Sequence, residues 1–158
     1  AKLYKEIQDD VYRFALYSLG NCTDAEDAVS DTFTEAFKSI KKLRSPEAFK
    51  SWIFKILSIQ CNRHIKKYIS ERKSAGIAFY EIEDKLTYDS TETGIEKVAL
   101  IQALDTLSAN DRMIVLLYTV HGYTVKEIAK IMSKPSGTVS SKLYRSLDKL
   151  KKILSTDE

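Results

Sequence analysis

The chain has 158 residues and a formal net charge of +3, a length that allows one domain or two small ones. Hydrophobic residues make up 44% of it, which excludes an intrinsically disordered chain. No apolar run is long enough to cross a membrane, and the first residues do not resemble a signal peptide. Because two cysteines, Cys22 and Cys61, cannot make a disulfide framework, we expect two reduced thiols in a cytoplasmic protein.

The first half of the chain carries three stretches of helical periodicity. A first helix is expected to end near Gly20 and Asn21, a C-cap signal. A capping box from Thr23 to Glu26 predicts the start of a second helix, with apolar residues at i, i+3, i+4 spacing as far as Ile40. A third helix is predicted to open with Ser45 as cap and Pro46 at its first position, and to run to about Tyr68.

Helical periodicity is lost after this point and then returns. Residues 70–94 mix Ser, Thr, Gly and acidic side chains, which indicates a flexible linker. Apolar spacing resumes near Ile95, and Ser108 with Asp111 predicts another capped helix. The sequence therefore predicts an all-α protein of two small helical domains, residues 1–69 and 95–158, joined by a flexible linker at residues 70–94.

The second domain contains the pattern of a helix-turn-helix. Thr124 and Glu127 form a capping box, and Pro135 pushes the preceding residue out of the α region, which ends that helix. Ser136 is expected to cap the next helix, whose apolar stripe contains Val139, Leu143, Leu147 and Leu150. Such a second helix enters the major groove of DNA.

Polar and basic side chains occupy the rest of this helix and are candidates for DNA contacts. Arg145 has the fork that pairs with guanine, and Tyr144 could pack on a thymine methyl group. Lysines on the flanks suit phosphates, as does the helix N-terminus. The candidate duplex-binding residues are Thr138, Ser140, Ser141, Lys142, Tyr144, Arg145 and Lys149.

The first domain divides into an acidic and a basic part. Residues 1–36 contain 3 basic and 8 acidic residues, and residues 37–69 contain 9 basic and 1 acidic. In the third helix, cations interleave with aromatic residues, a combination suited to single-stranded nucleic acid. We expect the rings of Phe49 and Trp52 to be core. The acidic second helix would be repelled by DNA and favours a protein partner.

No enzymatic constellation is visible. There is no Gly-rich phosphate loop, and His64 and His121 have no nucleophile nearby in sequence. Cys61 and His64 are spaced like half of a zinc site, but no second pair of ligands follows. We therefore expect no metal, no cofactor, no small-molecule substrate and no catalysis.

Together these segments resemble the bacterial RNA polymerase sigma factors of the extracytoplasmic-function subfamily. The resemblance is carried by residues 24–29 (DAEDAV), by residues 45–56 around Phe49 and Trp52, and by residues 107–145, which end in GTVSSKLYR. Ser133 stands where members commonly have a turn glycine.

The resemblance implies an initiation factor that reads a promoter twice. The second domain would read the −35 element as duplex and pack on the β flap of core RNA polymerase. The first would bind the β′ clamp helices through Asp24, Asp27, Asp31 and Phe37, and would capture the unpaired strand of the −10 element through Lys50, Lys55, Asn62, Arg63 and Lys66. An anti-sigma factor, often membrane-anchored in this family, is implied as a further partner.

Two other functions remain open from the sequence. A stand-alone helix-turn-helix regulator, whose first half dimerises or senses a ligand, would bind duplex DNA tightly without polymerase. A helical adaptor that binds only proteins would show no salt-dependent affinity for DNA. The acidic second helix beside the basic third helix favours the sigma factor over both.

Overall fold

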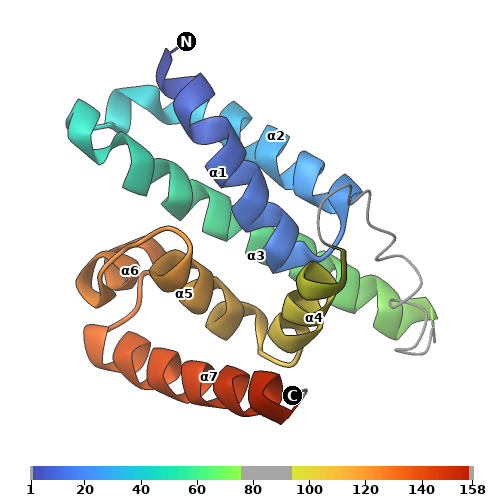
Figure 1. The fold of residues 1–158 in the computed structure, drawn as a ribbon. Helices are drawn as coiled ribbons and strands as arrows, with labels where there is room; N and C mark the ends of the chain where they lie inside the picture. Colours follow the sequence, from blue (N-terminus) through green and yellow to red (C-terminus); the bar gives the residue numbers. More distant parts are fainter. Residues whose placement is uncertain (1, 76–93, 157–158) are drawn as a thin grey trace.

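A computed structural model describes residues 2–75 and 94–156 (Figure 1). The predicted all-α class is confirmed, because these residues form helices and connections with no strand among them. The longer helices are α1 (Lys2–Leu19), α2 (Cys22–Ser39), α3 (Phe49–Ala75), α4 (Gly94–Asp105), α5 (Ala109–Thr119), α6 (Val125–Met132) and α7 (Ser136–Thr156), with short 3₁₀ turns at Ile40–Lys42 and Pro46–Ala48. Most of the predicted linker, residues 76–93, lies outside the described part.

Helices α1, α2 and α3 pack on one another as the first domain. Small residues on α2, Ala25 and Ala28, are buried and let α2 approach its neighbours closely. The large buried side chains come from the other two helices, with Phe14 on α1 and Phe54 on α3 meeting edge to face at 5.6 Å between ring centroids. Phe49 and Trp52 are partly buried against this core, as expected.

Two expected helix ends in this domain were wrong. Asn21, not Thr23, caps α2, because its side-chain oxygen accepts from the backbone N–H of Asp24 at 3.1 Å. Gly20 adopts φ +72° at the end of α1, which leaves Asn21 as the single extended residue before α2. The third helix continues to Ala75 rather than ending near Tyr68, because residues 71–73 (ERK) are good helix formers.

Helices α4 to α7 form the second domain. Helix α5 is buried on all sides from Met113 to Leu117, because it packs on α6 and α7 and also on α1 and α3. The predicted cap of this helix is confirmed, since the Ser108 hydroxyl accepts from Asp111 N–H at 3.3 Å. The buried side of α7 carries Val139, Leu143 and Leu150 as predicted, with Leu147 partly buried.

The turn between α6 and α7 is as predicted, except for the residue at which α7 begins. The capping box at Thr124 is present in both directions, with distances of 3.2 and 3.3 Å to Glu127. Ser133 ends α6 in the left-handed region at φ 52° and ψ 48°, a conformation that favours glycine. Ser136 is already helical and is not the cap, because the carbonyl of Pro135 accepts the first helical bond, from Val139 N–H at 3.1 Å.

The two domains share one continuous core. Figure 1 shows α1, α2 and α3 stacked over the helices of the second domain. The buried cluster runs without a break from Ile7 on α1 to Leu150 on α7. Sequence periodicity predicts each domain but not this contact between them.

Candidate nucleic-acid and polymerase interfaces

The outer face of α7 is free to meet a ligand. Tyr144 is 77% exposed, and Ser141 and Arg145 lie beside it on the side of the helix opposite Val139 and Leu143. The Arg145 guanidinium makes one bond within its own helix, from Nε to the carbonyl of Ser141 at 3.3 Å. Thr138 and Ser140 are also exposed, near the start of α7. Five of the seven predicted duplex-binding residues therefore lie on one accessible surface.

The remaining two predicted residues, Lys142 and Lys149, point toward the rest of the domain. Lys142 pairs with Asp111 on α5 at 3.4 Å, and its side chain is only 29% exposed. Lys149 donates to the backbone carbonyl of Thr106 at 2.8 Å. Both lysines thus hold α7 against the end of α4 and the start of α5. Their charge still adds to the positive potential at the flank of the recognition helix.

One exposed face of α3 carries two lysine side chains and the amide side chain of an asparagine. Lys55, Asn62 and Lys66 follow one another at seven- and four-residue spacing, which places them on the same side of the helix. Ile59 lies among them and is 46% exposed. This face opposes the buried side chains of Ile53 and Leu57, so it belongs to the surface of the first domain.

Lys50 and Arg63 lie apart from that face. Lys50 is about 140° further around α3 than Lys55, and it pairs with Asp10 on α1 at 3.3 Å. Arg63 lines a cleft between α2 and α3, together with His64 and Asp31. His64 Nε2 lies 3.2 Å from Asp31 Oδ2 across this cleft. The structure therefore brings together three of the five residues predicted for the unpaired strand.

The residues predicted to bind polymerase lie along two edges of α2. Asp27 and Asp31 are exposed on the side of α2 nearer α3, and Asp24 is partly exposed in the first turn. Phe37 is 83% exposed at the other edge and faces α1. The apolar spacing expected as far as Ile40 would place Phe37 on the buried side of α2. That expectation was wrong, because Ala36 is buried at this point of the helix and no described residue covers Phe37.

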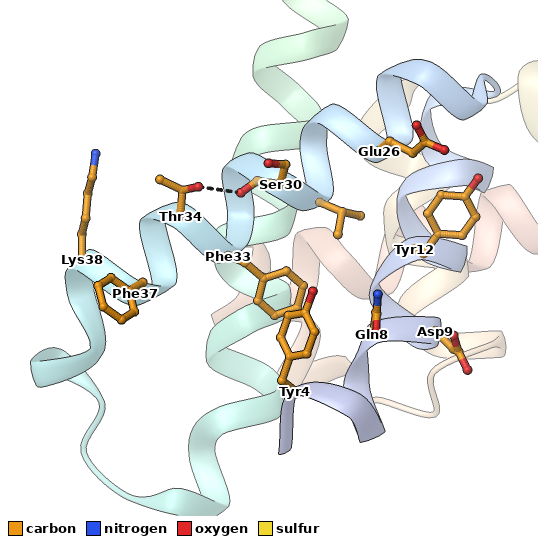
Figure 2. Close-up of a pocket in the computed structure, with 11 residues that line it drawn as sticks. Tyr4, Gln8, Asp9, Tyr12, Glu26, Ser30, Phe33, Thr34, Phe37 and Lys38 are labelled. Carbon is orange, nitrogen blue, oxygen red and sulfur yellow. Dashed lines mark hydrogen bonds between the residues drawn. The ribbon is translucent and has the colours of Figure 1, made fainter. Parts of the chain in front are cut away.

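Phe37 belongs to a groove that sequence analysis did not predict. Figure 2 shows Phe37, Phe33 and Tyr4 along one part of this groove, with Tyr12, Asp9 and Glu26 further along. The groove between α1 and α2 has a volume of about 820 Å³. The rings of Tyr4 and Phe33 meet edge to face at 4.6 Å between centroids. A second apolar row on α2, at Val29, Phe33 and Phe37, was the signal for it.

The described residues hold no group of three or more His, Cys, Asp and Glu side chains that could bind a metal. Cys61 is buried, and burial raises the pKa of its thiol to about 12, so it stays protonated. Within the same part of the chain, no helix is both long and apolar enough to span a membrane.

These surfaces define a class. The surfaces indicate a DNA-binding protein that also engages a protein partner. They are an exposed recognition helix, a basic face on a separate helix, and an acidic helix with an apolar groove beside it.

Comparison with known proteins narrows this class. The sequence matches Sigma-70 region 2 over residues 3–69 and Sigma-70 region 4 over residues 97–150. It is 31% identical to the RNA polymerase sigma factor SigV of Bacillus subtilis, over 96% of this chain and 87% of that protein. It is 28% identical to the ECF RNA polymerase sigma factor BldN of Streptomyces coelicolor, over 99% of this chain and 60% of that protein.

Two solved structures share the fold. The sigma factor RpoE, crystallised with the anti-sigma factor NepR from Bartonella quintana, matches with a TM-score of 0.82 and 22% identity, over 99% of this chain and 97% of that one. CnrH in complex with the cytosolic domain of CnrY matches with a TM-score of 0.71 and 19% identity, over 99% of this chain and 88% of that one.

The chain belongs to the bacterial RNA polymerase sigma factors, in the extracytoplasmic-function subfamily. It is an alternative sigma factor that directs transcription initiation, as the resemblance predicted, and a stand-alone helix-turn-helix regulator is not favoured.

Proposed function

We propose that the chain reads the −35 promoter element as duplex DNA through the outer face of α7. The observation that carries this is the exposure of Ser141, Tyr144 and Arg145 opposite the buried side of a helix-turn-helix. In this proposal Arg145 donates to guanine O6 and N7, and Tyr144 contacts a neighbouring base or methyl group. The N-terminal turn of α7 binds phosphate and fixes the register.

The −10 element is read as a single strand by α3. Lys55 and Lys66 follow the phosphates, while Asn62 and the exposed Ile59 between them meet unstacked bases. Arg63 extends this surface toward α2. Lys50, which pairs with Asp10, contributes to the strand only after that ion pair opens.

Core RNA polymerase is the proposed protein partner. Asp27 and Asp31 on α2 present carboxylates to the β′ clamp helices, with Asp24 in the first turn and Phe37 as an apolar anchor at the far edge. The second domain docks on the β flap. The chain acts in the cytoplasm, where an anti-sigma factor, often membrane-anchored in this family, holds it inactive. No small-molecule substrate and no catalysis by this chain are involved.

Mapping of transcription start sites tests this function. The purified chain is added to core polymerase of the same bacterium on fragmented genomic DNA, and the 5′ ends of the transcripts are sequenced. We expect transcripts that share one −35 and one −10 motif. A double variant, Tyr144→Ala with Arg145→Ala, is the matched control: it should still co-elute with polymerase but lose the shared −35 motif. Start sites that do not depend on the added chain would overturn the proposal.

A further inference from the structure

The exposed face of α7 carries one side chain whose charge has the same sign as that of DNA. Asp148 is the one carboxylate within α7, whose other charged side chains are lysine and arginine. It is exposed, with 51% of its side chain accessible. On a regular helix it is about 160° around the axis from Leu150, which is buried, and about 20° from Ser141, which is exposed. The carboxylate therefore lies in the middle of the face that we propose reads DNA.

Asp148 completes a set of residues with the spacing of a helix that reads base edges. Four positions of this face are spaced at i, i+3, i+4 and i+7, and they hold Ser141, Tyr144, Arg145 and Asp148. Homeodomains read the major groove from one helix through residues at the same four relative positions. The fourth position of such a helix therefore faces bases rather than solvent once DNA is bound.

The role of Asp148 within the fold is small. Its Oδ2 pairs with Nζ of Lys152, four residues further along α7, at 3.1 Å. More than half of each side chain is exposed, so water and salt screen the two charges and the pair adds little to the stability of the helix. A carboxylate is also unfavourable on a surface that meets a polyanion. Neither stability nor general attraction to DNA accounts for an acidic residue at this position.

Base selection does account for it. An ionised carboxylate only accepts hydrogen bonds. In the major groove cytosine presents the donor N4, whereas guanine presents the acceptors N7 and O6, and thymine the acceptor O4. Adenine presents the donor N6 beside the acceptor N7, which would face the second carboxylate oxygen. Cytosine is therefore the base that a carboxylate matches best, and guanine and thymine are the bases that it repels.

Helix geometry gives the place of that cytosine. Asp148 is three residues beyond Arg145, or about 4.5 Å along the helix axis, and successive base pairs are about 3.4 Å apart. A helix that lies along the groove therefore places the two side chains on neighbouring base pairs. We propose that Asp148 is a further specificity-determining residue, whose carboxylate accepts a hydrogen bond from N4 of a cytosine next to the base pair read by Arg145. This rests on the proposed reading of the −35 element by α7.

The carboxylate acts mainly by rejecting the wrong promoters. Its repulsion from the phosphates is the same for every DNA sequence, so it lowers all affinities by one factor. Its repulsion from the acceptors of guanine or thymine occurs only where one of these bases stands at the contacted position. Removal of the Asp148 carboxylate should therefore raise the affinity for such promoters more than the affinity for promoters with cytosine there.

Selection from a promoter library measures this preference. The full chain is assembled with core polymerase, and the bound members of a library randomised over the −35 element are sequenced. For the wild type we expect cytosine to be favoured over guanine and thymine by about fivefold or more at one position. Asp148→Ala should make that position indifferent, and Asp148→Asn should shift it toward adenine, which an amide pairs through N6 and N7. Lys152→Ala is the matched control: it breaks the same ion pair but leaves the carboxylate, so it should retain the cytosine preference.

Two results would overturn this role of Asp148. In the first, Asp148→Ala binds every library member more tightly by one common factor, which is the behaviour of a carboxylate that only repels phosphate. In the second, Asp148→Ala and the wild type select the same sequences with the same affinities. A failure of the proposed function has a different signature: the wild type would select no −35 motif, and Arg145→Ala would leave the selected sequences unchanged.

Discussion

Arg112 offers the sharpest test of how the second domain is held. Its guanidinium donates to three carbonyls, Leu104 at 3.0 Å, Leu107 at 3.3 Å and Ser18 at 2.5 Å, and its side chain is only 13% exposed. Burial lowers the pKa of Arg112 and raises that of Asp105, which lies 3.6 Å away, while the attraction between the two opposes both shifts. The carbonyl bonds, rather than this ion pair, are therefore the source of stability.

Arg112→Met preserves the stem of the side chain and removes all of its donors. A hydrogen bond to a charged group is worth about 1.5–3 kcal/mol. The carbonyls at helix ends recover some water after the change, so we expect a total loss of about 2–4 kcal/mol rather than the full sum. Arg112→Lys restores one charged donor without the planar fork, and should lose an intermediate amount.

Urea unfolding at neutral pH, followed by circular dichroism, measures this loss. The m-value must stay unchanged for the comparison to report stability. Arg145→Met is the matched control, because the exposed Arg145 bonds only within its own helix, and a change of no more than about 0.5 kcal/mol is expected. If the free energy of unfolding of Arg112→Met lies within about 0.5 kcal/mol of the wild-type value, the three hydrogen bonds to carbonyls do not stabilise the fold.

Further predictions concern the helix cap, the two DNA surfaces and the buried histidine. Thr124→Ala should lower stability by about 1 kcal/mol in urea unfolding, and a double-mutant cycle with Glu127→Ala should show coupling between the two sides of the capping box; additivity would contradict the box. Arg145→Ala should cost about 1–3 kcal/mol in promoter binding and relax the base preference at one −35 position; an equal loss on every promoter would contradict that role. Lys66→Ala should weaken binding to all promoters alike and make the affinity less dependent on salt, and an unchanged salt slope would contradict a phosphate contact. Burial is the largest cause that lowers the pKa of His121, from 6.5 to about 4. The unfolded chain therefore binds the extra proton first, and the free energy of unfolding should fall as pH drops from about 6.5 to about 4. In urea unfolding His121→Gln should lose less stability over that range, and a pH profile identical to that of the wild type would show that His121 does not titrate in this way.

Local signals in the sequence were sufficient for the elements and for the helix-turn-helix. The capping box at Thr124 and the break before Pro135 act within a few residues, so they can be read without tertiary information. The residue that caps α2 could not be predicted from local signals, because Asn21 and Thr23 both offer a capping oxygen. The positive φ of Gly20 ends α1 directly before Asn21, so Asn21 is the cap.

The arrangement of the domains depends on contacts that no local pattern indicates. His121 and Tyr123 lie in a connection without helical periodicity, and the hydrogen bond from Arg112 to Ser18 joins residues far apart in sequence. The orientation of Lys142 was equally hidden, because helical spacing places it at the side of α7 but does not reveal Asp111 beside it. The domain boundaries and the individual DNA and polymerase contacts stay predictions.

Site-specific crosslinking in the open promoter complex tests most directly that one chain reads DNA in two forms. A photoreactive amino acid replaces Tyr144 on α7 in one chain and Lys55 on α3 in another, and each is assembled with core polymerase and a mapped promoter. We expect the probe at 144 to label duplex near the −35 element, and the probe at 55 to label the unpaired strand near the −10 element only after melting. If both probes label the same element, or the probe at 55 labels paired DNA without polymerase, the two-surface account is contradicted.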